Sequence, residues 1–229
     1  MMRIVECRSP NHDARPQGAR IDMLVLHYTG MKTAAEALDR LCDPGAEVSA
    51  HYTVGTDGIV YRHVPEERRA WHAGASWWAG EANVNGRSIG IELVNPGHEF
   101  GYVPFPDEQI AALIDLADGI VRRRRIPARR VLGHSDVAPA RKTDPGELFP
   151  WRRLADFGIG LWPSPLAGKG QGESDFAAAL ARFGYGMPPQ VEVPMQAVVA
   201  AFQRHFRPSC IDGVADAECA AILAALNAA

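Results

Sequence analysis

Cysteine is scarce in this 229-residue sequence, which contains four: Cys7, Cys42, Cys210 and Cys219. None of the intervals between them matches the short spacing of a zinc ribbon or of a redox motif. Four cysteines are also too few for the disulfide scaffold on which small secreted proteins depend. We therefore expect reduced, structural cysteines, although the even count permits pairing, and Cys210 and Cys219 are nearest in sequence.

The sequence also lacks long hydrophobic runs. Residues 1–8 contain no apolar stretch of signal-peptide length, and no later run is long enough to span a bilayer. We therefore expect no transmembrane segment and, for the sequence as it stands, a cytoplasmic protein. If an export signal has been removed, the periplasm or cell envelope is the expected compartment instead.

A strong excess of charge of either sign is absent too. The formal net charge of -3 and the pI near 6.2 give no reason to expect a nucleic-acid partner. One basic run, residues 122–125, lies at the end of an apparent helix, where it suits the helix dipole and is expected to be solvated. A hydrophobic content of 47% and a charged content of 22% are ordinary for a soluble globular protein.

The pattern of apolar residues predicts strands interleaved with helices. A capping box at Thr33 and Glu36 opens one helix, and Asp107 is placed to cap another. Gly55 to Gly58 separates two strands of a predicted hairpin. The predicted strands cover residues 21–26, 50–54, 59–64, 88–94 and 130–132, and the predicted helices cover 33–41 and 107–121. We expect an α/β fold with a mixed central sheet flanked by helices.

The last third of the chain has a different composition. Gly, Pro, Ser and Lys dominate residues 161–173, which are typical of a linker. Three short helical patterns follow, at residues 175–183, 194–206 and 214–226. The sequence thus predicts an α/β domain at 1–160, a linker at 161–173 and a small all-α domain at 174–229.

Residues 133–146 hold several groups capable of metal chemistry. Pro145 disfavours the helical conformation for Asp144, so this part is expected to be extended, with Lys142 and Asp144 facing one side. His27 and His134 each follow a predicted strand. Two histidines and one carboxylate with an open fourth position are typical of a catalytic zinc site, and a nearby lysine can stabilise an oxyanion.

Five segments of the sequence carry a family resemblance: VLHYT (25–29), SAHY (49–52), AWHAG (70–74), SIGIE (88–92) and GHSDVAPARKTDPG (133–146). Together they resemble the zinc-dependent N-acetylmuramoyl-L-alanine amidases, which share their fold with the peptidoglycan recognition proteins and phage T7 lysozyme. The match runs from about Ile21 to Trp151. The tail resembles a helical peptidoglycan-binding domain through the weaker markers ALARFGY (179–185), VAAFQR (199–204) and IDG (211–213).

The resemblance implies a role for particular residues. His27, His134 and Asp144 would bind one Zn²⁺ in the catalytic domain. Glu92 would be the catalytic carboxylate, and Lys142 would stabilise the developing oxyanion. The residues expected to line the substrate groove are His51, Tyr52, Trp71, His72 and Asn85, of which Trp71 and His72 could equally be core residues. Trp77 and Trp78 either stack on sugar rings or pack their loop, and His63, His98 and His205 are expected to be structural.

The activity that this implies is hydrolysis of the amide between the lactyl group of N-acetylmuramic acid and L-alanine. The partner would be peptidoglycan or a muropeptide, and the protein is expected to be a monomer. Its tail distinguishes it from the cytoplasmic anhydro-muropeptide amidases and makes it more similar to the envelope form. One alternative is a non-catalytic peptidoglycan-binding protein on the same fold. Another is an unrelated metal-dependent hydrolase with a different substrate.

Overall fold

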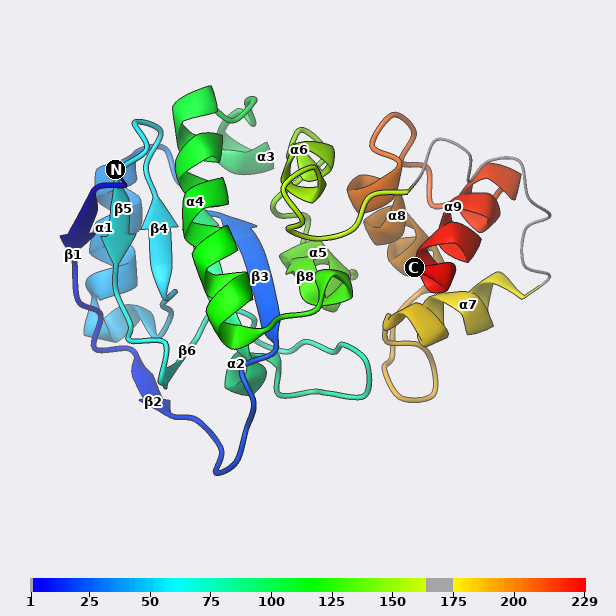
Figure 1. The fold of residues 1–229 in the computed structure, drawn as a ribbon, viewed down its shortest axis with the longest axis horizontal. Coiled ribbons are helices and arrows are strands. Elements are labelled where there is room, and N and C mark those ends of the chain that lie inside the picture. Colours follow the sequence, from blue (N-terminus) through cyan, green and yellow to red (C-terminus); the bar gives the residue numbers. More distant parts are fainter. Residues whose placement is uncertain (1, 164–174) are drawn as a thin grey trace.

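A six-stranded, mostly parallel sheet forms the centre of the protein in the computed structural model, which describes residues 2–163 and 175–229 (Figure 1). The strand order is β1-β5-β4-β7-β3-β8, and among these neighbours only β4 and β5 are antiparallel. The strands are β1 (Ile4–Glu6), β3 (Met23–Tyr28), β4 (Tyr52–Val54), β5 (Val60–Arg62), β7 (Ser88–Leu93) and β8 (Val131–Gly133). This confirms the predicted mixed sheet and its hairpin. A separate two-stranded sheet joins β2 (His12–Ala14) to β6 (Arg68–Ala70).

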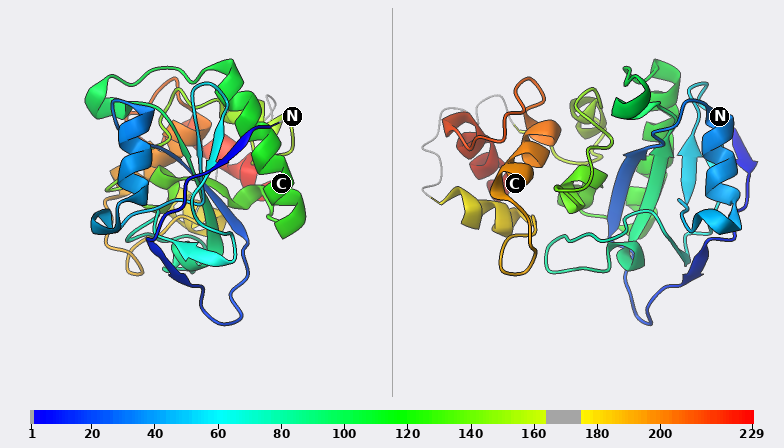
Figure 2. Two further views of the ribbon diagram at one scale, coloured as in Figure 1. Left: turned by 90° about the vertical axis from the view of Figure 1, so that its left-hand side faces the viewer. Right: turned by 180° about the vertical axis from the view of Figure 1, so that it is seen from behind.

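The two longer helices of the N-terminal part lie on opposite sides of the central sheet. In Figure 2, α1 (Ala34–Cys42) and α4 (Asp107–Arg124) flank the strands when the sheet is seen edge-on. Alternate residues of β3 and β7, such as Leu24, Leu26 and Ile91, pack against Ile110 and Leu113 of α4 in one hydrophobic core. Because side chains alternate along a strand, the residues between them point to the other face.

The ends of these helices confirm two expectations and correct one. The predicted capping box of Thr33 and Glu36 is present at α1. Asp107, however, is the first residue of α4 and makes no capping hydrogen bond, because the N-cap position belongs to Pro106. The basic run at the end of α4 is largely solvated, as predicted: Arg122, Arg123 and Arg125 are exposed, and only Arg124 is half-buried, where its Nε donates to the buried Glu66 Oε2 at 2.8 Å.

Short helices occupy several of the connections. They are α2 (Val84–Arg87), α3 (Gly97–Phe100), α5 (His134–Val137) and α6 (Trp151–Ala155), with 3-10 turns at Pro44–Ala46 and Ala128–Arg130. The helix α5 directly follows β8, so the chain turns sharply at the end of that strand.

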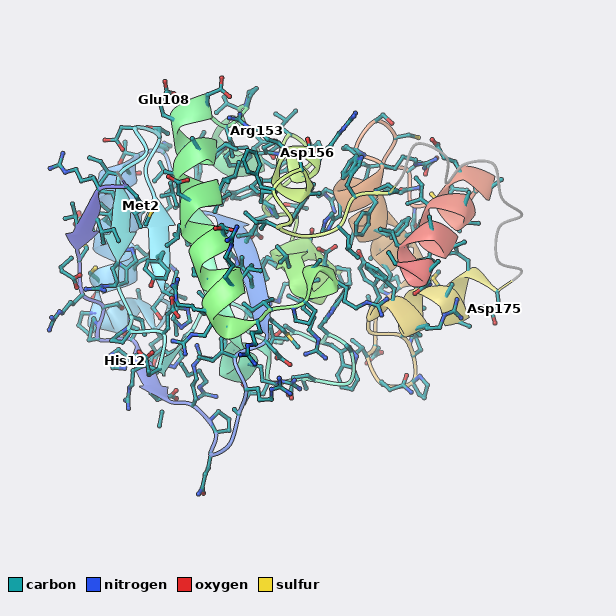
Figure 3. The ribbon with its side chains drawn as sticks, in the orientation of Figure 1. Met2, His12, Glu108, Arg153, Asp156 and Asp175 are labelled. Carbon is teal, nitrogen blue, oxygen red and sulfur yellow. The ribbon has the colours of Figure 1, made fainter. Side chains whose placement is uncertain are left out.

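Three helices make up the C-terminal part: α7 (Phe176–Phe183), α8 (Met195–Phe206) and α9 (Ala217–Ala228). They lie beside the β8 end of the sheet (Figure 1), and Asp175, labelled in Figure 3, caps α7 by accepting from Ala178 N at 3.0 Å. Their apolar faces share one core with Met23, Val25 and Trp78 of the N-terminal part. Most of the predicted linker, residues 164–173, lies outside the described residues.

All four cysteines are free thiols. The closest pair is Cys7 and Cys42, whose sulfur atoms are 3.2 Å apart, rather than the pair nearest in sequence. Across the described residues, none of the helices has the length and apolar character needed to cross a membrane.

Candidate active site

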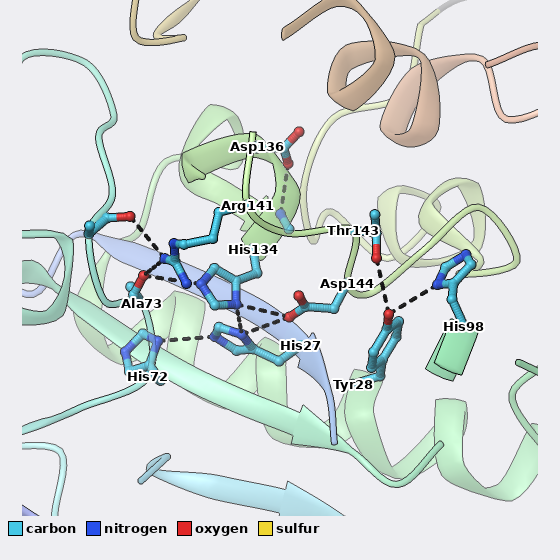
Figure 4. Close-up of polar contacts among 12 residues, drawn as sticks. His27, Tyr28, His72, Ala73, His98, His134, Asp136, Arg141, Thr143 and Asp144 are labelled. Atoms are coloured by element: carbon cyan, nitrogen blue, oxygen red, sulfur yellow. Dashed lines mark hydrogen bonds and ion pairs between the residues drawn. The ribbon is translucent and has the colours of Figure 1, made fainter. Parts of the chain in front are cut away.

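The site is built where three neighbouring parallel strands end. His27 on β3 and Glu92 on β7 are register partners, so their side chains lie on the same face of the sheet. His134 begins α5 immediately after β8, which pairs with β3 on its other side. Asp144 lies ten residues after His134, and Figure 4 shows its carboxylate facing both histidines. Residues distant in sequence are therefore brought together only by the assembled sheet.

Three potential metal-binding atoms converge at this point. His27 Nδ1 and His134 Nδ1 are 2.9 Å apart, and each lies 3.0 Å from Asp144 Oδ2 (Figure 4). All three residues are buried: His27 is 1% exposed, His134 is 3% exposed and Asp144 is 5% exposed. This donor set of two imidazoles and one carboxylate is the one that zinc accepts in catalytic sites.

Hydrogen bonds on the outer side of each ring indicate where its proton lies. His134 Nε2 is 3.1 Å from the carbonyl oxygen of Ala73, so this nitrogen carries the proton and Nδ1 is left with a lone pair. Ser88 Oγ donates to Val84 O at 2.7 Å and therefore accepts from His72 Nε2 at 3.1 Å. His72 Nδ1 is then the acceptor for His27 Nε2 at 3.0 Å.

Both Nδ1 atoms are consequently unprotonated and directed at the same point, beside a carboxylate oxygen. Outer hydrogen bonds of this kind orient histidine ligands and fix their tautomer in metal sites. The residues present thus fit a divalent metal ion such as zinc.

Electrostatics favour the neutral form of His27 and the ionised form of Asp144. Burial, reinforced by the neighbouring His134, lowers the pKa of His27 to about 4. Burial alone would raise the pKa of Asp144, but His134 and His27 outweigh it and hold this pKa well below its usual range. Neutral imidazoles and an ionised carboxylate are the protonation states that bind a cation.

Glu92 and Lys142 line the same cavity as His134 and Asp144. The cavity has a volume of about 410 Å³ and also contains Tyr28, Trp71 and His72 at its wall. One carboxylate oxygen of Glu92, Oε2, is buried and has no hydrogen-bond partner among the described residues. Burial, together with the charge of Asp144, raises the pKa of Glu92 well above its usual value, while Lys142 opposes this shift. An unpaired carboxylate with a raised pKa is suited to accepting and releasing a proton.

The segment that supplies His134, Lys142 and Asp144 is compact at its start. It forms α5 and a turn up to Arg141, whereas Lys142 and Thr143, close to Pro145, belong to neither a helix nor a turn. Ser135 N donates to Asp144 O at 2.9 Å, which ties the two ligand-bearing turns together. Lys142 and Asp144 nevertheless line the same cavity.

The structure distributes the predicted groove residues over different positions. Trp71 and His72 line the cavity. Gly90 faces His72 so closely that an added Cβ would lie 2.5 Å from the imidazole. The absence of a side chain at Gly90 therefore makes room for His72 on the strand that carries Glu92. Asn85 lies behind them and accepts from His72 N and Ala73 N at 3.1 and 2.8 Å.

His51 and Tyr52 lie farther from the convergent donors. His51 is fully buried and its Nδ1 accepts from Gly90 N at 3.0 Å. Tyr52 is the register partner of Ile91, so it points to the α4 face, where its hydroxyl donates to Glu66 at 2.9 Å. A larger hollow of about 790 Å³ lies on that side, and its carboxylate Glu66 is already paired with arginines. Substrate contact by these two residues stays a prediction.

Sequence reasoning missed some residues that the structure places at the site. Tyr28 directly follows His27, and its hydroxyl lies 3.0 Å from His98 Nδ1 and 3.1 Å from Thr143 Oγ1 (Figure 4). Its place one residue after a predicted ligand was the available signal. Ser88 was missed because its role depends on His72, which is distant in sequence.

Comparison with known proteins identifies the family to which this sequence is similar. Residues 17–147 match the family model of N-acetylmuramoyl-L-alanine amidases. The chain is 40% identical to the N-acetylmuramoyl-L-alanine amidase AmiD of Escherichia coli, over 97% of this chain and 90% of that protein. It is 35% identical to the 1,6-anhydro-N-acetylmuramyl-L-alanine amidase AmpD of Enterobacter cloacae, over 64% of this chain and 85% of that protein.

Solved structures show that the similarity in fold also covers almost the whole chain. The complex of Escherichia coli AmiD with anhydro-N-acetylmuramic acid-L-Ala-D-γ-Glu-L-Lys superposes with a TM-score of 0.80 at 41% identity, covering 93% of this chain and 91% of that one. AmpDh3 of Pseudomonas aeruginosa in complex with an anhydromuramic pentapeptide gives a TM-score of 0.83 at 36% identity, covering 93% of each chain.

Proposed function

This chain belongs to the N-acetylmuramoyl-L-alanine amidase family, and we propose how it acts as a hydrolase of cell-wall recycling. In the proposed reaction, which depends on zinc, it cleaves the amide between the lactyl group of N-acetylmuramic acid and L-alanine. The observation that carries the zinc-dependent mechanism is the convergence of two unprotonated imidazole nitrogens and Asp144 Oδ2 beside the unpaired carboxylate of Glu92. Each of these groups alone has a structural explanation, but together they form the parts of a hydrolytic site.

One zinc ion per catalytic domain would be held by His27, His134 and Asp144. When bound, zinc supplies a Lewis acid that polarises the scissile carbonyl and lowers the pKa of water. Three protein ligands leave a position open for reactants, which distinguishes a catalytic zinc site from a structural one.

Glu92 and Lys142 would perform the proton transfer and the charge stabilisation. Glu92 takes a proton from the attacking water and delivers it to the leaving amine, a dual role for which its raised pKa is suited. Lys142 stabilises the negative charge that develops on the carbonyl oxygen. Removing one such stabilising group commonly lowers kcat by about 10²–10³-fold.

The substrate proposed for the groove is a muropeptide. Two similar structures contain anhydromuramic peptides, which supports soluble anhydro-muropeptides as substrates. In this chain Trp71 and His72 line the cavity, and contact of substrate with His51, Tyr52 and Asn85 is part of the proposal.

The organisation of the whole protein is also proposed. Residues 1–160 would form the catalytic domain, residues 161–173 a linker, and residues 174–229 a peptidoglycan-binding-like helical domain in a monomeric protein. The cytoplasm is the proposed compartment, and the periplasm or envelope is the alternative if an export signal precedes this sequence. Fractionation of cells expressing the natural gene distinguishes the two.

Mass spectrometry of reaction products tests the activity directly. The protein is incubated with soluble anhydro-muropeptides and with intact sacculi, each with and without a metal chelator. We expect release of intact stem peptides beginning with L-alanine, loss of this release with the chelator, and recovery when zinc is added back. Absence of peptide release from both substrates would contradict the amidase assignment, and activity unaffected by the chelator would contradict the metal.

A further inference from the structure

Asp136 connects the candidate metal site to the C-terminal helices. It lies on α5 two residues after His134 and is 1% exposed. Its Oδ2 accepts from Gly133 N at 2.7 Å and so closes the turn that begins with His134. The same oxygen accepts from His205 Nδ1 on α8 at 2.7 Å, and Oδ1 accepts from the Tyr185 hydroxyl at 2.7 Å. Two of the three donors to this buried carboxylate therefore come from the C-terminal part.

The packing around Asp136 makes this connection rigid. The ring of Tyr185 lies 4.9 Å from that of Trp78, which comes from the loop next to Ala73 and is 1% exposed. The ring of His205 stacks on Trp151 at 3.7 Å. A backbone hydrogen bond of 2.8 Å from Ala79 N to the carbonyl of Gly184 joins the same two parts of the chain. Close-packed interiors transmit displacements to their neighbours rather than absorbing them.

The turn that Asp136 closes contains His134 and is hydrogen-bonded to the segment that contains Asp144. His134 is the first residue of α5, and Ser135 N holds the backbone carbonyl of Asp144 at 2.9 Å. A shift of α5 would therefore move two of the three convergent donors relative to His27, which belongs to the rigid strand β3. Burial, followed by the charge of Asp136, raises the pKa of Tyr185 well above its usual value, so its hydroxyl stays available as a donor.

We propose that Tyr185 and His205 are positioning residues of the metal site, acting through Asp136 to hold the α5 turn. The C-terminal helices would then be part of the catalytic unit, in addition to any binding to the wall. This inference rests on the proposed assignment of His134 and Asp144 as zinc ligands. Partners that hydrogen-bond a metal ligand directly commonly contribute 10- to 100-fold to metal affinity or activity. Tyr185 and His205 act one step farther away, through Asp136, so the lower end of this range, up to about 10-fold, is expected for each donor.

Substitutions in the full chain separate positioning from plain stability. Tyr185→Phe and His205→Phe remove one donor each and keep an aromatic ring. Leu223→Ala is the matched control, because Leu223 is fully buried in the core of the C-terminal helices on α9 and is not a donor to Asp136. His205→Asn is the rescue variant, because its amide places a donor near the position of Nδ1 while losing the stacked ring.

Three quantities are measured for each protein: zinc affinity by competition with a chromogenic chelator, kcat and KM on a soluble anhydro-muropeptide at saturating zinc, and Tm. We expect Tyr185→Phe and His205→Phe to weaken zinc binding about 10-fold and to lower kcat with little change in KM. Leu223→Ala should lower Tm with unchanged zinc affinity. His205→Asn should retain more zinc affinity than His205→Phe, even where its Tm is lower.

Wild-type zinc affinity and kcat in both phenylalanine variants, with only Tm reduced, would overturn the inference. Equal loss of zinc affinity in Leu223→Ala would overturn it as well, because the effect would then follow stability alone. Failure of the proposed function is recognised separately: the wild-type protein itself would then bind no zinc in the competition assay or release no peptide.

Discussion

Two buried groups of histidine and aspartate lie on either side of α5 and differ in where their protons are. At the candidate metal site, His27 and His134 donate outward through Nε2, and both Nδ1 atoms face Asp144. In the second group, His205 donates inward through Nδ1 to Asp136, and its Nε2 has no hydrogen-bond partner among the described residues.

The difference shows what makes a metal site out of ordinary residues. Each oxygen of Asp136 already accepts a hydrogen bond from a protein donor, so this carboxylate stabilises the fold and faces protons rather than a cation. Asp144 shares one oxygen between two nitrogens that have no proton to give. Residue type and burial are alike in the two groups, and the hydrogen bonds of the outer nitrogens decide the chemistry.

Substitution of the two aspartates, Asp144 and Asp136, should show the largest difference between the two groups. Asp144→Ala removes a proposed ligand, so zinc affinity should fall steeply and kcat/KM at least about 10³-fold, since bound metal contributes several kcal/mol to transition-state stabilisation. Asp136→Ala leaves Tyr185 and His205 without their buried acceptor and also releases the α5 turn, so it should lower Tm more than Asp144→Ala does and weaken zinc binding far less. Chelator competition and thermal unfolding of both variants measure the contrast. A larger loss of Tm in Asp144→Ala than in Asp136→Ala would contradict it.

Glu92 should separate proton transfer from metal binding within the first group. Glu92→Gln preserves the shape of the side chain but cannot accept a proton, so kcat should fall about 10²–10⁴-fold. Zinc affinity should stay close to that of the wild type, because Glu92 is not among the three convergent donors. Steady-state kinetics on a soluble muropeptide, with zinc content measured on the same samples, test this. Near-normal turnover would remove Glu92 from the role of base.

Sequence patterns predicted the catalytic part of the fold well, because its signals are local. Two apolar runs, before His27 and before His134, predict β3 and β8, and the alternation from Ser88 to Leu93 predicts β7. The turn at Gly55 predicts the hairpin of β4 and β5. The convergence of the metal donors was expected from strand ends and from the family resemblance. The short helices α2, α3 and α6 were not predicted, since four or five residues are too few to show a period.

The connection between the two parts of the chain could not be predicted. A helical pattern identifies an apolar face but not the surface that covers it. Trp78 was left with two interpretations, and the structure shows it buried against Phe183 and Tyr185. His205 was expected to be structural, but its partner Asp136 lies 69 positions earlier in the chain, and nothing local to either residue indicates the other.

Substitution of His72 should have the smallest main effect among these comparisons. It tests the comparison because His72 determines which nitrogen of His27 carries the proton. Burial, together with the neighbouring His27 and His51, lowers the pKa of His72 well below its usual value, so its Nδ1 remains an acceptor. His72→Phe removes this acceptor while keeping a ring against Gly90. Zinc affinity should then fall about 10-fold, as it does when partners behind metal ligands are lost. Ser88→Ala, one step farther along the same chain of hydrogen bonds, should have a smaller effect measured by the same competition assay. An equal or larger loss in Ser88→Ala would mean that proton placement on His27 is not controlled through His72.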